Sequence, residues 1–231
     1  MNATFRSPDH QPLDLGLIGN CRVAALVNPL GRIVWWCAPR FDGDPVFCNL
    51  LSGDQEKGFC EVALEGMVES SSGYRRNTAV IETVLRDGDG NALRISDFAP
   101  RFKQFGRHFR PATIVRRIEP LSGLPRIRLR VRPTHDYGKP CHPIAGSNHI
   151  RFVGSSTDPL RLRRNSGRSM AAAEMTTLPR RAASADSERL SLSTSSTAGA
   201  SPDHSWNETS RRVARKAGHT SSCGASPSAT R

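Results

Sequence analysis

The stretch LDLGLIGNCRVAALVNPLGRIVWWCAPRFDGDPVFCNLL, from Leu13 to Leu51, decides the fold. It holds two of the three tryptophans and three of the six cysteines of the chain. Two apolar segments, Arg22–Val27 and Arg32–Cys37, flank the tetrapeptide Asn28-Pro29-Leu30-Gly31. Proline fixes φ at the second position of a turn, and glycine adopts positive φ at its end. The stretch therefore predicts an antiparallel β-hairpin.

Short apolar segments with turn residues between them continue along the chain. In Arg126–Arg132 the apolar side chains alternate with four arginines, which indicates a half-buried strand with a solvated basic face. The other predicted strands are Phe59–Leu64, Ala79–Arg86, Ala92–Phe98, Thr113–Glu119 and His149–Val153. Regularly spaced short strands of this kind predict an all-β fold, an antiparallel β-sandwich.

The composition changes after Gly154. All nine phenylalanines, both tyrosines and every isoleucine precede this point, and Ser, Ala, Arg and Thr dominate the remaining 77 residues. Such a segment buries too little apolar surface to offset its conformational entropy. We therefore predict a flexible N-terminus (1–12), a β-sandwich domain (13–154) and a disordered basic tail (155–231), with transient helix near Arg168–Met175 and Glu208–Ala217.

The net charge of +12 and the pI near 10.4 raise the question of a nucleic-acid partner. The arginines are spread over the whole chain and only 6% of residues are aromatic, so we expect no nucleic acid to bind. No C-x-x-C pair is present, which favours free thiols and a cytoplasmic location. The first residues lack the pattern of a signal peptide, and no apolar run is long enough to span a membrane.

Several motifs invite a functional interpretation that the residue spacing does not support. His135, Cys141, His142 and His149 match no zinc pattern, and Asp87-Gly88-Asp89-Gly90 lacks the later ligands of a calcium loop. The four arginines of Arg126–Arg132 have no aromatic residues between them for base stacking. We expect no metal and no cofactor.

The segment Trp35–Asp44 holds the most distinctive side chains. Trp35 and Trp36 are adjacent, so on a strand they point to opposite faces, one into the core and one outward. A glycosidase needs two carboxylates, and the spacing of Asp42 and Asp44 does not exclude them, although nothing in the sequence indicates a raised pKa in either. An ion pair in the loop from Arg40 to one of them is the plainer interpretation.

LIGNCRVAALVNPLGRIVWWCAPRFDGDPVFCNLL resembles the N-terminus of bacterial glycoside hydrolase family 15 proteins, the glucoamylase and trehalase-like group. The resemblance continues through YRRNTAVIETVLRDGDGNALRISDFAPRF, VRRIEPLSGLPRIRLRVRP, THDYG and GSNHIRFVG, and it covers Leu13 to Gly154. In that family this region is a β-sandwich of the supersandwich type, which precedes an (α/α)6 barrel. The barrel carries the two catalytic glutamates that hydrolyse α-glucosidic bonds with inversion.

The resemblance implies a truncated glycoside hydrolase that lacks the barrel and its catalytic residues. It also implies that Trp35, Trp36, Arg40 and Asp42 face substrate or the barrel, and that the exposed barrel-facing surface favours self-association. Trehalose or an α-glucan would be the carbohydrate of the intact family. A tail translated out of frame would explain the composition after Gly154. The alternatives are a non-catalytic carbohydrate-binding or interaction module and a basic nucleic-acid-binding protein.

Overall fold

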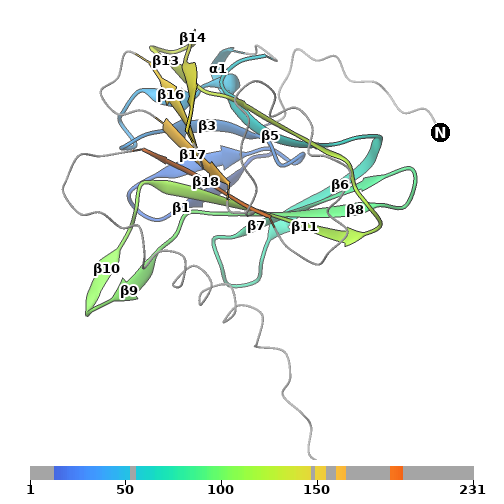
Figure 1. Cartoon of the computed structure of the whole chain (residues 1–231). Helices are drawn as coiled ribbons and strands as arrows, with labels where there is room; N and C mark the ends of the chain where they lie inside the picture. The colour runs from blue at the N-terminus through green and yellow to red at the C-terminus, as the bar shows by residue number, and fades with distance from the viewer. Residues whose placement is uncertain (1–12, 53–55, 147–148, 155–159, 165–187, 195–231) are drawn as a thin grey trace, which may run out of the picture. The chain divides into compact units, whose positions relative to one another are not determined.

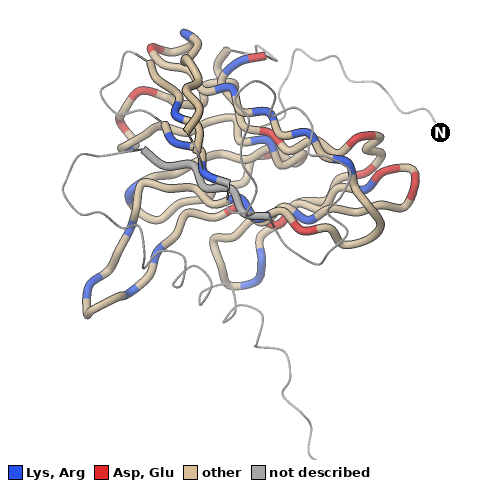
Figure 2. The backbone as a smooth tube through the Cα atoms, in the orientation of Figure 1, with Lys and Arg blue, Asp and Glu red and all other residues tan. Residues whose placement is uncertain are grey.

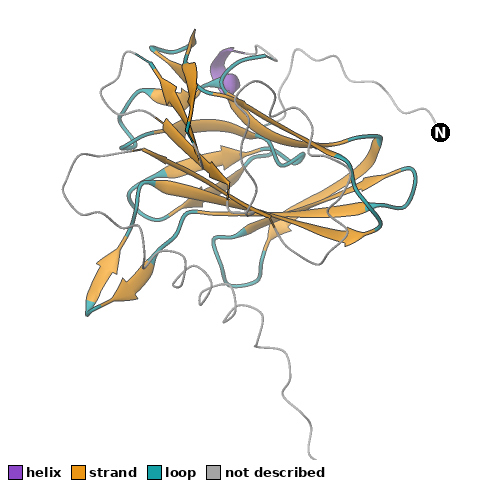
Figure 3. Ribbon diagram, viewed as in Figure 1, coloured by secondary structure: helices purple, strands orange, loops and turns teal. Residues whose placement is uncertain are grey.

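The computed structural model describes residues 13–52, 56–146, 149–154, 160–164 and 188–194. Nearly all elements are antiparallel strands, and the one helix among the described residues is the single turn α1 (Asn49–Ser52) (Figure 3). The chain divides into two units, Met1–Ser196 and Thr197–Arg231, of which the second lies outside the described residues. In the described part of the chain, no helix is long and apolar enough to cross a membrane.

Two large sheets make up the first unit (Figure 1). The first sheet contains β1 (Gly16–Gly19), β2 (Ala24–Val27), β3 (Ile33–Cys37), β4 (Pro45–Phe47), β5 (Phe59–Leu64) and β12 (Ile127–Arg132). The second sheet contains β6 (Met67–Tyr74), β7 (Ile81–Asp87), β8 (Ala92–Phe98), β11 (Thr113–Ser122), β15 (His142–Ala145), β16 (His149–Val153), β17 (Leu160–Arg164) and β18 (Glu188–Thr194). Two further hairpins are formed by β9 (Phe102–Gln104) with β10 (Arg107–Phe109) and by β13 (Thr134–His135) with β14 (Lys139–Pro140).

The opening hairpin forms as the turn residues predict. The amide of Gly31 donates to the carbonyl oxygen of Asn28 at 2.9 Å, and Gly31 has a φ of +73°. The side chain of Asn28 also accepts hydrogen bonds from the amides of Leu30 and Arg32. The turn is therefore closed by backbone and side-chain bonds together, as is typical of asparagine in turns.

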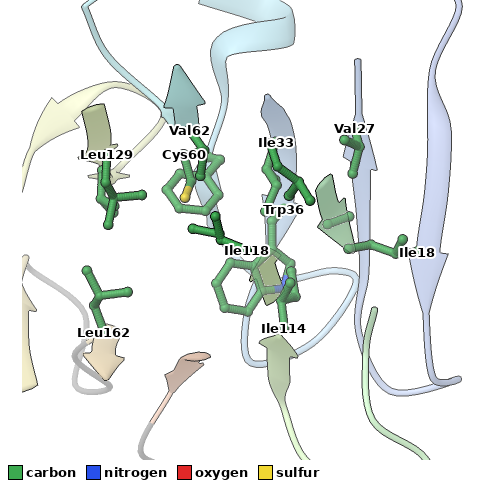
Figure 4. Packing of buried hydrophobic residues seen from close by; sticks show 14 of the residues in the cluster. Ile18, Val27, Ile33, Trp36, Cys60, Val62, Ile114, Ile118, Leu129 and Leu162 are labelled. Carbon is green, nitrogen blue, oxygen red and sulfur yellow. The ribbon is translucent and has the colours of Figure 1, made fainter. Parts of the chain in front are cut away.

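The core lies between the two sheets, as expected for a β-sandwich. Figure 4 shows side chains of both sheets pointing toward one another, with Trp36 and Cys60 from the first and Ile118 and Leu162 from the second. The alternation predicted for β12 is confirmed, because Ile127, Leu129 and Val131 are all buried.

One ion pair is buried within this core. Nε and Nη2 of Arg116 on β11 donate to the two carboxylate oxygens of Asp97 on β8, both at 2.8 Å. Arg116 also donates to the carbonyl oxygens of Cys60 on β5 and Gly31 in the β2–β3 turn. Burial lowers the pKa of the Arg116 guanidinium, but the charge and hydrogen bonds of Asp97 outweigh this and raise its pKa overall. This cation joins the two sheets.

Strands β17 and β18 lie in the segment that composition predicts to be disordered, so the structure differs from the prediction at these residues. Leu160 and Leu162 are buried in the core, while Arg161 and Arg163 alternate with them. Backbone pairing continues from β16 through β17 and β18 to β11. A few alternating residues are enough to add a strand to an existing sheet edge, and the average composition of a long segment conceals them. The predicted flexible N-terminus, the two predicted helical segments and the rest of 155–231 lie outside the described residues.

Candidate functional site

Trp36 is the core member of the tryptophan pair. Its side chain is fully buried, and its ring centroid lies 5.8 Å from that of Phe47 on β4. The Nε1 atom is buried and has no hydrogen-bond partner within the described structure. Trp35, on the other face of β3, is half-buried. Trp36 therefore has no exposed ring face on which a sugar could stack, and Trp35 has only part of one.

The loop after β3 contains the predicted ion pair. Nε and Nη2 of Arg40 donate to the two carboxylate oxygens of Asp42 at 2.9 and 3.0 Å. Both side chains are largely exposed, at 76% and 69%. The hydrogen bonds from Arg40 hold the pKa of the Asp42 carboxyl below its usual value. A general acid in a glycosidase needs a raised pKa, so Asp42 is unsuited to that role.

Asp44 connects this loop to a distant part of the chain. Its carboxylate accepts a hydrogen bond of 2.6 Å from the backbone amide of Asp136, in the β13–β14 hairpin. Asp136 in turn pairs with Lys139 at 3.1 Å and with His135 at 3.3 Å. The loop 38–44 and the hairpin 134–140 therefore lie together, and we call this surface the loop end.

Two aromatic side chains are exposed on the loop end. Phe41 follows Arg40 and is 54% exposed, and Tyr137 at the tip of the β13–β14 hairpin is 67% exposed. Asp136 and Tyr137 have positive φ angles of 45° and 57°, which non-glycine residues rarely adopt. Exposed aromatic residues beside an arginine are the side chains that protein interfaces favour.

The charge of Asp44 affects the pKa of two cysteines close to the loop end, Cys37 and Cys141. Burial, and then the Asp44 carboxylate, raise the pKa of the Cys37 thiol and raise that of Cys141 to about 11. A thiol with a raised pKa is a poor nucleophile at neutral pH. His135, Cys141 and the other candidate ligands do not converge, because no group of three His, Cys, Asp or Glu side chains in the described residues could hold a metal ion.

The basic face of β12 is partly neutralised by acidic side chains. Glu61 on β5 accepts hydrogen bonds from Arg32 and Arg130, and both guanidinium groups lie over the ring of Phe59, at 4.4 and 5.2 Å from its centroid. Arg126 pairs with Glu65 at 3.9 Å. The face is therefore a mixed-charge surface, and not an open phosphate-binding one.

The sequence points to Trp35, Trp36, Arg40 and Asp42 as site residues. Among these four, Arg40 and Asp42 form an ion pair in the structure. The sequence does not point to Phe41 or Tyr137. The hydrogen bond between Asp44 and Asp136 joins residues 92 positions apart, and no local sequence pattern predicts it. The turn sequence His135-Asp136-Tyr137-Gly138 was the available signal for the second half of the loop end.

Comparisons with known proteins identify the family of the chain. A curated trehalase from Thermoplasma volcanium is 31% identical over 143 residues, which cover 60% of this chain. The match spans only 22% of the length of that trehalase. A family model described as "Trehalase-like, N-terminal" matches residues 8–213. The chain thus belongs to the family of trehalase-like N-terminal domains.

Proposed function

We propose that this chain is the non-catalytic β-sandwich domain of a trehalase-like glycoside hydrolase, and that it docks against the catalytic part of that enzyme through the loop end. Family membership and the distant trehalase relative support the enzyme class. The match spans 22% of the relative, and catalysis would reside in the part of such an enzyme outside the matched region. The five free cysteines of the described residues favour the cytoplasm as the compartment.

The observation that carries the docking role is the hydrogen bond from the Asp136 amide to Asp44. It holds two loops from distant parts of the sequence as one surface. That surface presents Phe41 and Tyr137 beside the Arg40–Asp42 pair. Aromatic residues and arginine anchor protein interfaces, whereas a catalytic site needs a general acid, and the lowered pKa of Asp42 does not provide one.

The first test is an assay of hydrolysis. Pure protein is incubated with trehalose, maltose or a soluble α-glucan, and released glucose is measured. We expect no glucose above a blank without protein, and steady release that depends on the protein concentration would contradict the proposal.

The second test measures docking. The Thermoplasma volcanium trehalase is produced without the region that aligns with this chain, and the chain is added to it. We expect binding by calorimetry and recovery of trehalase activity, with the relative's own aligned region as the positive control.

A loop-end variant, Phe41→Ser with Tyr137→Asn, should fold normally and fail to bind. Asparagine suits the positive φ at position 137. Arg128→Glu, an exposed change on β12, is the matched control and should bind as the wild type does. Equal binding by the loop-end variant would show that the docking surface lies elsewhere.

A further inference from the structure

A basic, aromatic hairpin extends from the sandwich at the β8–β11 connection. Its strands β9 and β10 pair only with each other in the part of the chain that the structure describes, and Figure 1 shows them projecting away from both sheets. The sequence from Arg101 to Arg110, RFKQFGRHFR, has four Arg or Lys residues, one histidine, three phenylalanines and no acidic residue. We call these residues the arm.

The arm presents its aromatic side chains to solvent. Phe105 at its tip is 90% exposed and has a φ of +49°. The rings of Phe102 and Phe109 stack on each other with centroids 5.6 Å apart, which stiffens the hairpin behind the tip. A bulky residue held at positive φ is strained, and such strain concentrates at functional positions. An isolated two-stranded hairpin is also only marginally stable without a partner.

The chain carries a surface of complementary character. The β5–β6 and β7–β8 turns lie together, since the amide of Gly88 donates to the carbonyl oxygen of Gly66 at 3.3 Å. Glu65, Asp87 and Asp89 line these turns, with Arg126 at 3.9 Å from the exposed Glu65 carboxylate, and Met67 and Val68 are exposed beside them. The β11–β12 loop adds exposed Leu124, whose amide donates to the side chain of Asn91. We call this surface the acidic end.

The arm and the acidic end lie at opposite ends of the same two strands. The acidic turn 87–90 precedes β8, and the arm leaves the far end of β8 and leads into β11. The acidic end is reached again at the C-terminal end of β11, a strand of 10 residues. At about 3.3 Å per residue this separates the two surfaces by roughly 30 Å. Figure 2 shows the basic arm and the acidic turns on opposite sides of the fold, so one copy cannot pair them internally.

We propose that the arm of one copy docks on the acidic end of another, so that the chain associates head to tail. Phe105 would pack on the apolar surface of Met67, Val68 and Leu124. Lys103 and Arg107 would face Glu65 and Asp89. The charges complement each other, and each surface has the exposed apolar centre that a protein interface needs. Such a contact is heterologous, because its two halves are different surfaces of the chain.

This contact is independent of the loop end and of the proposed docking to a catalytic domain. The arm is small, so association should be weak, as it is for interfaces below about 1,200 Å². Because opposite charges contribute, it should also weaken with salt, as the screening length falls from about 10 Å at 0.1 M to about 3 Å at 1 M.

The experiment is sedimentation velocity of the full chain and of two charge-reversal variants. The arm variant is Lys103→Glu with Arg107→Glu, and the acidic-end variant is Glu65→Lys with Asp89→Lys. All four changes are at the surface and leave the stacked phenylalanines and the turn hydrogen bonds of Asp87 in place. Arg128→Glu with Arg132→Glu on β12 changes the charge as much as the arm variant and is the matched control.

We expect the wild type and the control to sediment as a mixture of monomer and larger species at about 100 µM, a range suited to weak interfaces. Each charge-reversal variant alone should be monomeric. A mixture of the two should associate again, because the intact arm of one variant can meet the intact acidic end of the other, and the reversed arm and reversed acidic end also carry opposite charges. Phe105→Asn, which keeps the positive φ, should weaken association without changing charge.

Three outcomes would overturn the proposal. A wild type that stays monomeric at low salt would exclude the contact. Association that survives both charge reversals, or that the control abolishes equally, would place the interface elsewhere. Variants that fail to associate on mixing would rule out the head-to-tail arrangement. Binding of monomeric wild type to duplex DNA or to anionic vesicles, lost only in the arm variant, would assign the arm to that ligand instead.

Discussion

Two Arg–Asp pairs in this molecule have nearly the same geometry and opposite surroundings. Arg116 and Asp97 form two hydrogen bonds of 2.8 Å, and their side chains are 1% and 0% exposed. Arg40 and Asp42 form bonds of 2.9 and 3.0 Å, and their side chains are 76% and 69% exposed. The lengths of the bonds do not distinguish the two pairs, and the solvent around them does.

The difference shows that burial sets what an ion pair does for a fold. Water screens and replaces the exposed pair, so its loss should leave the fold intact. Removing one partner of the buried pair leaves an uncompensated charge in the core. Arg116 also donates to the carbonyl oxygens of Cys60 and Gly31, and both residues are buried. Substitutions should therefore cost most stability at the buried pair, less at the turn it holds and least at the exposed pair.

Arg116→Ala should be the most damaging change. It leaves the Asp97 carboxylate buried and unpaired, which typically lowers the free energy of unfolding by about 3–5 kcal/mol. Urea denaturation monitored by tryptophan fluorescence measures the loss. The double variant Arg116→Met with Asp97→Leu removes both charges and should recover much of the stability. A loss below about 1 kcal/mol in Arg116→Ala would mean that the pair does not hold the sheets together.

Arg116→Lys keeps the charge and tests the fork geometry of the guanidinium. Lysine is a point charge and cannot reach two carboxylate oxygens and two carbonyl oxygens at once. The free energy of unfolding should fall by about 1.5–3 kcal/mol, the size of one hydrogen bond to a charged group. This loss is smaller than that expected for Arg116→Ala. Stability equal to that of the wild type would show that charge alone is sufficient at this position.

Gly31→Ala tests the turn whose carbonyl oxygen Arg116 binds. A residue other than glycine at a φ of +73° is destabilised by about 1–2 kcal/mol. An added Cβ would also lie 3.3 Å from both Ile95 and Thr83 of the second sheet. Gly90→Ala is the matched control, because its φ is +82° and an added Cβ meets nothing within 4 Å. A larger loss at Gly31 than at Gly90 measures the crowding between the sheets, and equal losses would show that none exists.

Arg40→Ala should leave the midpoint of urea denaturation unchanged at pH 7. The pKa of Asp42 is lower in the folded chain than in the unfolded one, because Arg40 donates to it. Such a group adds stability above its unfolded pKa and loses it as the pH falls through its folded pKa. The exposure of both side chains makes this contribution too small to resolve, so the wild type and Arg40→Ala should give overlapping acid-denaturation curves. Separated curves would show that the loop end contributes to folding.

The parts of the fold that local sequence determines could be predicted. The turn at Asn28–Gly31 and the alternation in Ile127–Arg132 follow from residue types a few positions apart. Strand β6 gave no such signal, because an edge strand with both faces largely exposed has no apolar alternation. Arg116 reads as one more surface arginine beside Arg117 until Asp97, Cys60 and Gly31 are brought around it.

In the candidate site, too, contacts between nearby residues could be predicted, and contacts between distant residues could not. The contact between Arg40 and Asp42 spans two positions, and the sequence predicts an ion pair from Arg40 to Asp42 or Asp44. The hydrogen bond from the Asp136 amide to Asp44 depends on how the strands between them are arranged. Which tryptophan faces the core depends on the register of β3, and periodicity at two adjacent positions cannot decide it.

The contacts of Arg116 also bear on how the protein opens and closes. One cation holds β8, β11, β5 and the β2–β3 turn, so none of these segments can detach without exposing the buried carboxylate of Asp97. Their backbone amides should therefore exchange hydrogen for deuterium together, at the rate of global unfolding. The β9–β10 hairpin, which no such cation secures, should exchange well before them. The sandwich would then behave as one cooperative unit, although its two sheets share no strand.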